Sequence, residues 1–233
     1  MSKPIAWSYS SLNQYLTCGK QYHEVRVLKN FKEAPSEQLL WGERVHKFME
    51  QALNEPTDGN TGDEFKAYRR VAERFAETKG QLATEQQLAI TNSFKPTAWF
   101  APDVWCRGVL DAIWIDGPIA RVVDWKTGKR KPDSYQLKLF ALLTFAHHPK
   151  VNRVNTAFVW LQTGKMDTAK FLRKDVPMLW QDILPNVRRL EYAHNTQTWI
   201  PKPSGLCRGW CPVKTCSFWD GTKSEPIKTT ATA

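Results

Sequence analysis

Two short segments in the middle of the chain, 108–111 (Gly-Val-Leu-Asp) and 122–128 (Val-Val-Asp-Trp-Lys-Thr-Gly), predict adjacent β-strands. The sequence Asp-Gly-Pro at 116–118 has the composition of a turn, so the two strands are expected to form a hairpin. An antiparallel hairpin brings side chains that are far apart in the sequence opposite one another. This strand pair therefore constrains the fold strongly, because it fixes which side chains meet.

The hairpin is expected to gather charged side chains at one point. Because side chains alternate along a strand, Asp124 and Lys126 share a face and Trp125 points away. Asp111 would lie beside Asp124, and neighbouring carboxylates repel each other unless a hard divalent cation, Mg²⁺ or Mn²⁺, lies between them. Lys126 would then orient a water or stabilise charge on a phosphate. The arrangement indicates metal-dependent phosphodiester hydrolysis, whereas the Asp-x-Lys tripeptide alone would indicate an exposed ion pair at a strand end.

The composition favours a polyanionic partner. The 233 residues include 33 Lys+Arg against 23 Asp+Glu, which gives a formal net charge of +10. An excess of this size is typical of nucleic-acid binding, although a merely basic soluble protein has the same charge. No apolar leader segment follows the first residues and no apolar run approaches membrane-spanning length. A soluble, cytoplasmic protein without a membrane partner is expected.

Four of the five cysteines form a pattern. Cys207, Cys211 and Cys216 cluster near the C-terminus, and Cys18 lies near the N-terminus. Disulfides are not expected in a reducing cytosol, and the glycine, proline and charged neighbours of the C-terminal three are typical of loops. Four thiolates of this kind bind either Zn²⁺ or an iron–sulfur cluster. Cys106 alternates with Gly and Leu along a predicted strand and is expected in the core.

Periodicity and turn signals predict an α/β fold. Helices are expected over 8–28, 36–53, 63–79, 133–146 and 176–193, with Ser36 capping the second and Pro132 opening the fourth. Strands are expected over 81–91, 104–115 and 120–126, followed by a hairpin of 154–162 and 166–172. We expect one domain over 1–220, with N-terminal helices (8–79), a core (81–194) and a cysteine segment (205–219), and a disordered tail over 221–233.

An ordered set of motifs resembles the RecB-type nuclease domains of the PD-(D/E)XK superfamily. The motifs are 8–12 with Tyr15, Cys18 and Tyr22; Gly42, His46 and Glu50; Gly108 and Asp111; the 124–128 run; and Gln136 with Leu137. The resemblance extends over residues 8–219 and is to the iron–sulfur branch, which includes AddB nuclease domains, CRISPR adaptation nucleases and stand-alone phage exonucleases. It implies a mixed central sheet flanked by helices, a helical N-terminal addition and a C-terminal cysteine cluster.

The resemblance also implies roles for individual residues. Four positions would bind the divalent metal: His46, Asp111, Asp124 and the backbone carbonyl of Trp125. Lys126 would position the attacking water, and Gln136 would contact the substrate or order its helix. Glu85 matches a frequent acidic position of the family, whereas Phe140 stands where the family usually has a tyrosine. The imidazole ligand slightly favours Mn²⁺ over Mg²⁺.

Basic and aromatic side chains are expected to bind the nucleic acid. The cations near the proposed site are Lys129, Arg130, Lys131 and Lys138. Their contacts with phosphates would be independent of sequence and sensitive to salt. The rings with stacking faces for single-stranded bases are Trp125, Trp160, Trp199, Trp210 and Trp219.

Taken together, the motifs indicate a divalent-metal-dependent DNA exonuclease. It would act on single-stranded or duplex ends in recombination, repair or phage DNA metabolism, with a helicase or an annealing protein as a partner. The resemblance implies a [4Fe–4S] cluster at Cys18, Cys207, Cys211 and Cys216, with Zn²⁺ as the alternative. A structure-selective endonuclease and a non-catalytic nucleic-acid-binding module with a four-cysteine zinc site are the alternative functions.

Overall fold

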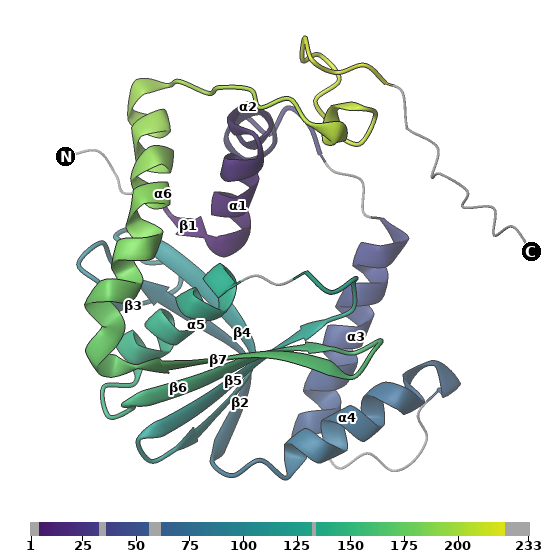
Figure 1. Ribbon diagram of the computed structural model, residues 1–233, viewed down its shortest axis with the longest axis vertical. Helices are drawn as coiled ribbons and strands as arrows, with labels where there is room; N and C mark the ends of the chain where they lie inside the picture. The colour runs from purple at the N-terminus through teal and green to yellow at the C-terminus, as the bar shows by residue number, and fades with distance from the viewer. Residues whose placement is uncertain (1–4, 33–35, 56–61, 132–133, 222–233) are drawn as a thin grey trace, which may run out of the picture. The chain divides into compact units, whose positions relative to one another are not determined.

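The computed structural model of the protein describes residues 5–32, 36–55, 62–131 and 134–221 (Figure 1). The chain divides into two compact units. The first comprises Met1–Tyr9 and Pro35–Pro185, and the second comprises Ser10–Ala34 and Asn186–Ala233. The single domain expected over 1–220 stays a prediction.

A seven-stranded mixed sheet lies in the described part of the first unit (Figure 1). Its strands are β1 (Trp7–Ser8), β2 (Gln81–Ile90), β3 (Pro96–Thr97), β4 (Cys106–Asp116), β5 (Ile119–Lys126), β6 (Arg153–Trp160) and β7 (Lys165–Leu172). They follow the order β3-β2-β4-β5-β6-β7, with β1 paired to β4. The β5–β6 and β1–β4 pairs are parallel and the other pairs are antiparallel. The mixed sheet confirms the α/β fold, whereas β1 and β3 are too short to give a sequence signal.

Helices cover both faces of the sheet. The described helices of this unit are α3 (Glu37–Asn54), α4 (Lys66–Ala76), α5 (Ser134–His147) and the first part of α6 (Val176–Thr196). On one face, Val45 of α3 shares a core with residues of α4 and with Trp125. On the other face, Leu137 of α5 packs against Phe158. Trp125 therefore points away from Asp124, as its place in the strand predicts. Among the described residues, no helix has the length and apolar character needed to span a bilayer.

Local signals predicted several element boundaries. The side-chain oxygen of Ser36 accepts a hydrogen bond from the backbone N–H of Leu39 at 3.1 Å, so the predicted cap of α3 is confirmed. The predicted helix over 63–79 begins as a 3₁₀ turn (Asp63–Phe65) and ends at Ala76. The predicted start of α5 at Pro132 and Asp133, and the tail after Gly221, lie outside the described residues.

The prediction of one continuous helix over 8–28 is wrong. The chain forms α1 (Tyr9–Thr17), α2 (Gly19–Tyr22) and a π-helical turn (His23–Val27). Cys18 separates α1 from α2 with an extended backbone, at φ −161°. A Cβ on Gly19 would lie 2.9 Å from the carbonyl oxygen of Ile200, so the start of α2 passes close to the chain that follows α6. This long-range packing within the second unit overrides the local helical pattern.

Candidate active site

The open end of the β4–β5 hairpin holds the two predicted aspartates. The strands stay paired from their turn up to Ala112 and Val123, so Asp111 and Asp124 occupy the next position. Oδ2 of Asp111 accepts a hydrogen bond from the backbone N–H of Trp125 at 2.7 Å. Both carboxylates are buried. The hairpin predicted from the sequence therefore brings the two aspartates together. The hydrogen bond from Trp125 to Asp111 links the two strands just beyond their last backbone pair.

The regular alternation of β4 breaks at this point. A Cβ on Gly108 would meet Leu143 of α5, whereas Ala112 lies in the core with α3 and α4. Residues 108 and 112 would share a face in a regular strand, so the strand rotates between them. The pairing of β2 with β4 skips Glu85, whose φ of +47° is rare for a residue with a side chain. Strained backbone of this kind is found most often at functional sites.

Three side chains from separate elements meet beside this break. His46 of α3, Glu85 of β2 and Asp111 of β4 each offer one ligand atom, and these atoms all lie within 4.8 Å of one another. Nδ1 of His46 lies 3.3 Å from Oδ2 of Asp111. One imidazole nitrogen and two carboxylate oxygens are suitable ligands for Mn²⁺ or Mg²⁺. The donor set therefore fits a divalent cation.

The pKa shifts of Glu85 and His46 show that negative charges repel one another in this group. Burial and the charge of Asp111 raise the pKa of Glu85. Burial works to lower the pKa of His46, but the hydrogen bond with Asp111 and the surrounding carboxylates raise it above its usual value. Negative charge is therefore concentrated here, and a divalent cation would stabilise it.

The second aspartate is held by a different set of contacts. Oδ2 of Asp124 lies 2.6 Å from Nζ of Lys126, and its Oδ1 accepts a hydrogen bond from Nε2 of Gln136 at 3.0 Å. Nζ of Lys126 also donates to Oε1 of Gln136 at 3.1 Å. Burial and the neighbouring Asp111 raise the pKa of Asp124 to about 7. Gln136 of α5 thus orders both the aspartate and the lysine of β5.

The structure brings together all six side chains predicted for the active site, but in two groups. Asp124 was expected beside His46 and Asp111 as a metal ligand. In the structure Glu85 lies with His46 and Asp111, and both oxygens of Asp124 contact Lys126 or Gln136, so the assignment of Asp124 as a metal ligand stays a prediction. The hairpin signal identified the aspartates, and the family resemblance pointed to Glu85, whereas the backbone rotation at Glu85 has no local sequence signature.

A surface hollow of about 670 Å³ opens onto the site. It is lined by α3, by Glu85 of β2 and by the end of β5, including His46, Lys126 and part of Trp125. Glu50, one helical turn after His46, lies in the same wall. A hollow of this size admits a segment of a polymer substrate to the lysine and to the proposed metal ligands.

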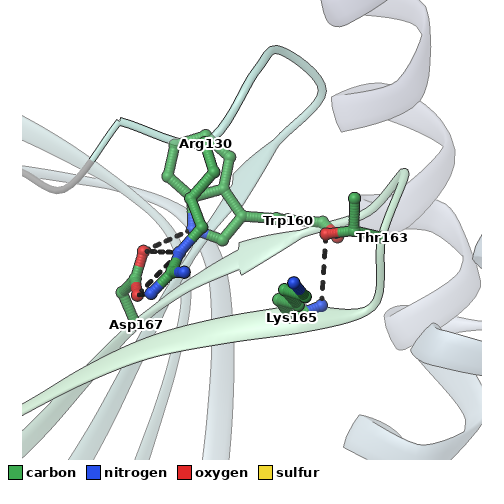
Figure 2. A network of polar contacts seen from close by, with 5 residues as sticks. All are labelled: Arg130, Trp160, Thr163, Lys165 and Asp167. Carbon is green, nitrogen blue, oxygen red and sulfur yellow. Dashed lines mark hydrogen bonds and ion pairs between the residues drawn. The ribbon is translucent and has the colours of Figure 1, made fainter.

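Two of the four cations predicted to bind substrate are paired with carboxylates. Figure 2 shows the guanidinium of Arg130 against Asp167, with Nε of Arg130 3.0 Å from both carboxylate oxygens. Nε1 of Trp160 donates to the same aspartate at 2.7 Å. Lys138 is ion-paired with Asp182. Lys129 and Lys131 are exposed in the segment that follows β5.

Some predicted contact positions are buried. The ring of Phe140, where the family usually has a tyrosine, packs in the core beside Gly108. Trp125 and Trp160 are at most 5% exposed, so neither ring has a face open to a base. The exposed rings of this unit lie elsewhere, in residues that the sequence alone did not single out.

In the second unit, the four predicted cysteines line one small pocket: Cys18, Cys207, Cys211 and Cys216. The sulfur of Cys18 accepts a hydrogen bond from the backbone N–H of Lys202 at 3.4 Å. Burial and the three neighbouring thiols raise the pKa of Cys211. Cys106 is fully buried on β4 in the first unit, as expected for a core residue.

Comparisons with known proteins bear on the family and the fold of the chain. The sequence profile of the PD-(D/E)XK nuclease superfamily matches residues 6–216. The crystal structure of a candidate exonuclease from Eubacterium rectale superimposes with a TM-score of 0.54 at 13% identity, covering 94% of this chain and 90% of that one. The structure of SSO0001 covers 94% and 88% at 12% identity, with a TM-score of 0.47. A search of curated proteins finds no match.

Proposed function

The chain belongs to the PD-(D/E)XK nuclease superfamily, and on this premise we propose that it is a divalent-metal-dependent DNA exonuclease that hydrolyses phosphodiester bonds from DNA ends. The observation that carries the proposal is the group of His46, Glu85 and Asp111 beside the contacts of Lys126. Enzymes of this superfamily use divalent metals. The net charge of +10 favours a nucleic acid as substrate.

The proposed metal ligands are the imidazole of His46 and the carboxylates of Glu85 and Asp111, with Asp124 as a further carboxylate beside them. When bound, the cation would supply Lewis-acid stabilisation of phosphate charge and a water of lowered pKa. The chain itself supplies the orientation, because the bond from the backbone of Trp125 fixes the Asp111 carboxylate.

Lys126 is the residue that we assign to the reacting water or phosphate oxygen. An ammonium group has three donors. Asp124 is ion-paired with it at 2.6 Å and Gln136 accepts a hydrogen bond from it at 3.1 Å, and Lys126 lines the hollow. A fixed donor aimed at developing charge stabilises the transition state more than a mobile one. Asp124 and Gln136 therefore act as positioning residues for this lysine.

The preference for DNA ends, and a role in recombination, repair or phage DNA metabolism, rest on the resemblance to RecB-type nucleases. The solved structure with the TM-score of 0.54 is described as a candidate exonuclease, and it supports the fold alone. A helicase or an annealing protein remains part of the proposal as a partner.

The test is cleavage of end-labelled linear DNA and of covalently closed circles with Mg²⁺ or Mn²⁺. Linear DNA should be degraded, closed circles spared and EDTA should stop the reaction. Lys126→Gln should lower the rate by about 10³-fold, since loss of one transition-state donor costs this much. Lys47→Gln removes an exposed charge from the same hollow and should stay within a few-fold of wild type. Cutting of closed circles would favour the endonuclease, and inactivity with both metals would favour the binding module.

We further propose that the four cysteines of the second unit hold a [4Fe–4S] cluster. All four line one pocket, yet among the described residues no three of their sulfurs lie within 4.8 Å of one another. A single Zn²⁺ with Zn–S bonds of about 2.3 Å requires sulfurs about 3.8 Å apart, and a cluster of four irons spaces them more widely. Anaerobically purified protein should contain iron and sulfide and absorb visible light. Colourless protein with stoichiometric zinc would replace the cluster by a zinc site.

A further inference from the structure

The loop between β2 and β4 is firmly anchored to the first unit. The ring of Phe94 stacks on Trp180 at 4.5 Å, and Trp105 packs edge-on against Trp7 at 5.3 Å. The backbone N–H of Trp105 donates to Ile90 at 2.9 Å. This loop therefore has its own aromatic core, and the residues at its tip are held in place by that core.

An aromatic ring is nevertheless presented to solvent at this tip. Phe100 is 85% exposed, the largest fraction among the large hydrophobic residues that the structure describes. A ring exposed to solvent on an ordered loop adds almost nothing to the free energy of folding, because it buries almost no apolar area. Exposed rings on anchored loops are typical of binding surfaces.

The guanidinium of Arg107 completes this surface. Its Cζ lies 5.3 Å from the ring centroid of Trp99 and 5.8 Å from that of Phe100. Nε of Arg107 is buried without a hydrogen-bond partner among the residues that the structure describes. Two rings and a guanidinium therefore lie together.

The same surface lies near the proposed metal ligands. Arg107 precedes Asp111 by four residues on β4, a distance of about 13 Å along a strand. Gly108 faces α5, so Arg107 faces the side of the sheet that α3 and α4 cover. His46 of α3 approaches Asp111 on that side. One bound strand of a few nucleotides could reach both places.

We propose that Trp99, Phe100 and Arg107 form a stacking site for an unpaired base of the DNA strand that enters the active site. The site deepens the proposed function, on which it rests, by assigning a single-stranded segment to the substrate. Base stacking on exposed rings, with a guanidinium beside them, is how sequence-independent single-strand binding is achieved. The positive charge of the guanidinium favours a nucleic acid over an apolar peptide.

The first test is binding of a labelled single-stranded oligonucleotide, measured by fluorescence anisotropy in EDTA. Phe100→Leu keeps an apolar side chain but removes the ring, and it should weaken binding about tenfold, as loss of one base stack does. The slope of log Kd against log salt should stay unchanged, because no phosphate contact is lost. Tyr192→Leu removes another exposed ring, on α6, and should bind as wild type does. Duplex binding should be equal for all three proteins.

The second test moves an abasic position along the oligonucleotide. At one position, wild-type protein should lose about tenfold in affinity, whereas Phe100→Leu should lose nothing further there because the stack is already absent. Wild-type affinity in Phe100→Leu would overturn the proposal, as would equal abasic losses in both proteins. Self-association that Phe100→Leu abolishes, without any change in DNA affinity, would assign the ring to a second copy of the chain.

Failure of this inference is separable from failure of the proposed function, because the binding assays contain no divalent metal. A protein that fails to cleave DNA but shows the abasic result keeps the stacking site and loses the nuclease. A protein that cleaves linear DNA but binds it equally well with Phe100→Leu keeps the nuclease and loses the stacking site.

Discussion

The two proposed metal sites of this chain are built in opposite ways. His46, Glu85 and Asp111 come from α3, β2 and β4, and these helices and strands share a core that includes Val45 and Trp125. The cysteine pocket joins Cys18 to an irregular C-terminal segment. Within that segment the structure describes one 3₁₀ turn (Gly205–Cys207) and local backbone bonds, and Val213 is the buried hydrophobic residue.

The difference predicts what each metal contributes. The carboxylate group keeps its geometry through hydrophobic packing, so its cation would add reactivity and little stability. The cysteine segment buries too little apolar surface to hold itself in place, so its metal would supply folding free energy directly. Loss of metal should therefore abolish cleavage at the first site without unfolding it, and should unfold the second site.

The largest expected effect is on stability. Cys207→Ser should abolish iron binding and lower the Tm by more than about 10 °C, because structural metals contribute on the order of 10 kcal/mol to folding. Calorimetry and iron analysis would measure both. Cys106→Ala, a buried cysteine outside the pocket, should keep its iron content. A Cys207→Ser protein with the Tm and colour of wild type would contradict the claim that a metal at the cysteines stabilises the fold.

The second prediction concerns activity without loss of stability. Asp124→Asn should lower cleavage by about 10³-fold, because Lys126 loses its charged partner. Burial raises the pKa of Asp124 to about 7, so the folded state binds this proton more tightly than the unfolded chain. An ionised Asp124 therefore destabilises the metal-free protein as pH rises from about 4 past 7. At pH 8 in EDTA, the Tm of Asp124→Asn should equal or exceed that of wild type.

A lower Tm for Asp124→Asn, comparable with that of Cys207→Ser, would show that the active site also holds the fold together. Cleavage at the wild-type rate would instead remove Asp124 from the active site. The first result would contradict the claim that hydrophobic packing alone holds the active site, and the second would contradict the claim that Asp124 takes part in the reaction.

The smallest expected effect concerns Arg130. If its pair with Asp167 holds the loop after β5, then Arg130→Gln and Asp167→Asn should each raise KM a few-fold and leave kcat unchanged. If Arg130 instead binds phosphate, Asp167→Asn should free it and tighten DNA binding, with a steeper salt dependence. We expect the first outcome, because Trp160 fixes Asp167 in place (Figure 2).

Local patterns in the sequence predicted much of the site. Turn chemistry and alternation were enough to place Asp111 beside Asp124 and to send Trp125 to the opposite face. They could not predict that β4 and β2 rotate at Asp111 and Glu85, because a positive φ at a glutamate has no local signature.

Exposure was the property hardest to predict. The sequence favoured tryptophans as stacking rings. Trp125 and Trp160 are core residues, Trp210 of the second unit is exposed, and the most exposed ring of the described residues is Phe100. Likewise, Arg130 was predicted to contact the substrate. Its partner Asp167 lies on β7, which the fold brings beside the segment that follows β5. Both features depend on contacts between segments that no local pattern encodes.

The central claim is that His46, Glu85 and Asp111 hold the divalent cation. The most direct measurement is the affinity for Mn²⁺, by electron paramagnetic resonance, of wild type, Glu85→Gln and Glu50→Gln. Glu50 lines the same hollow but stands outside the group, so its variant removes the same charge nearby. Glu85→Gln should weaken Mn²⁺ binding by at least about 10- to 100-fold, since even the loss of a contact to a ligand costs this much, and Glu50→Gln by no more than a few-fold. Equal affinities for the two variants would contradict the account.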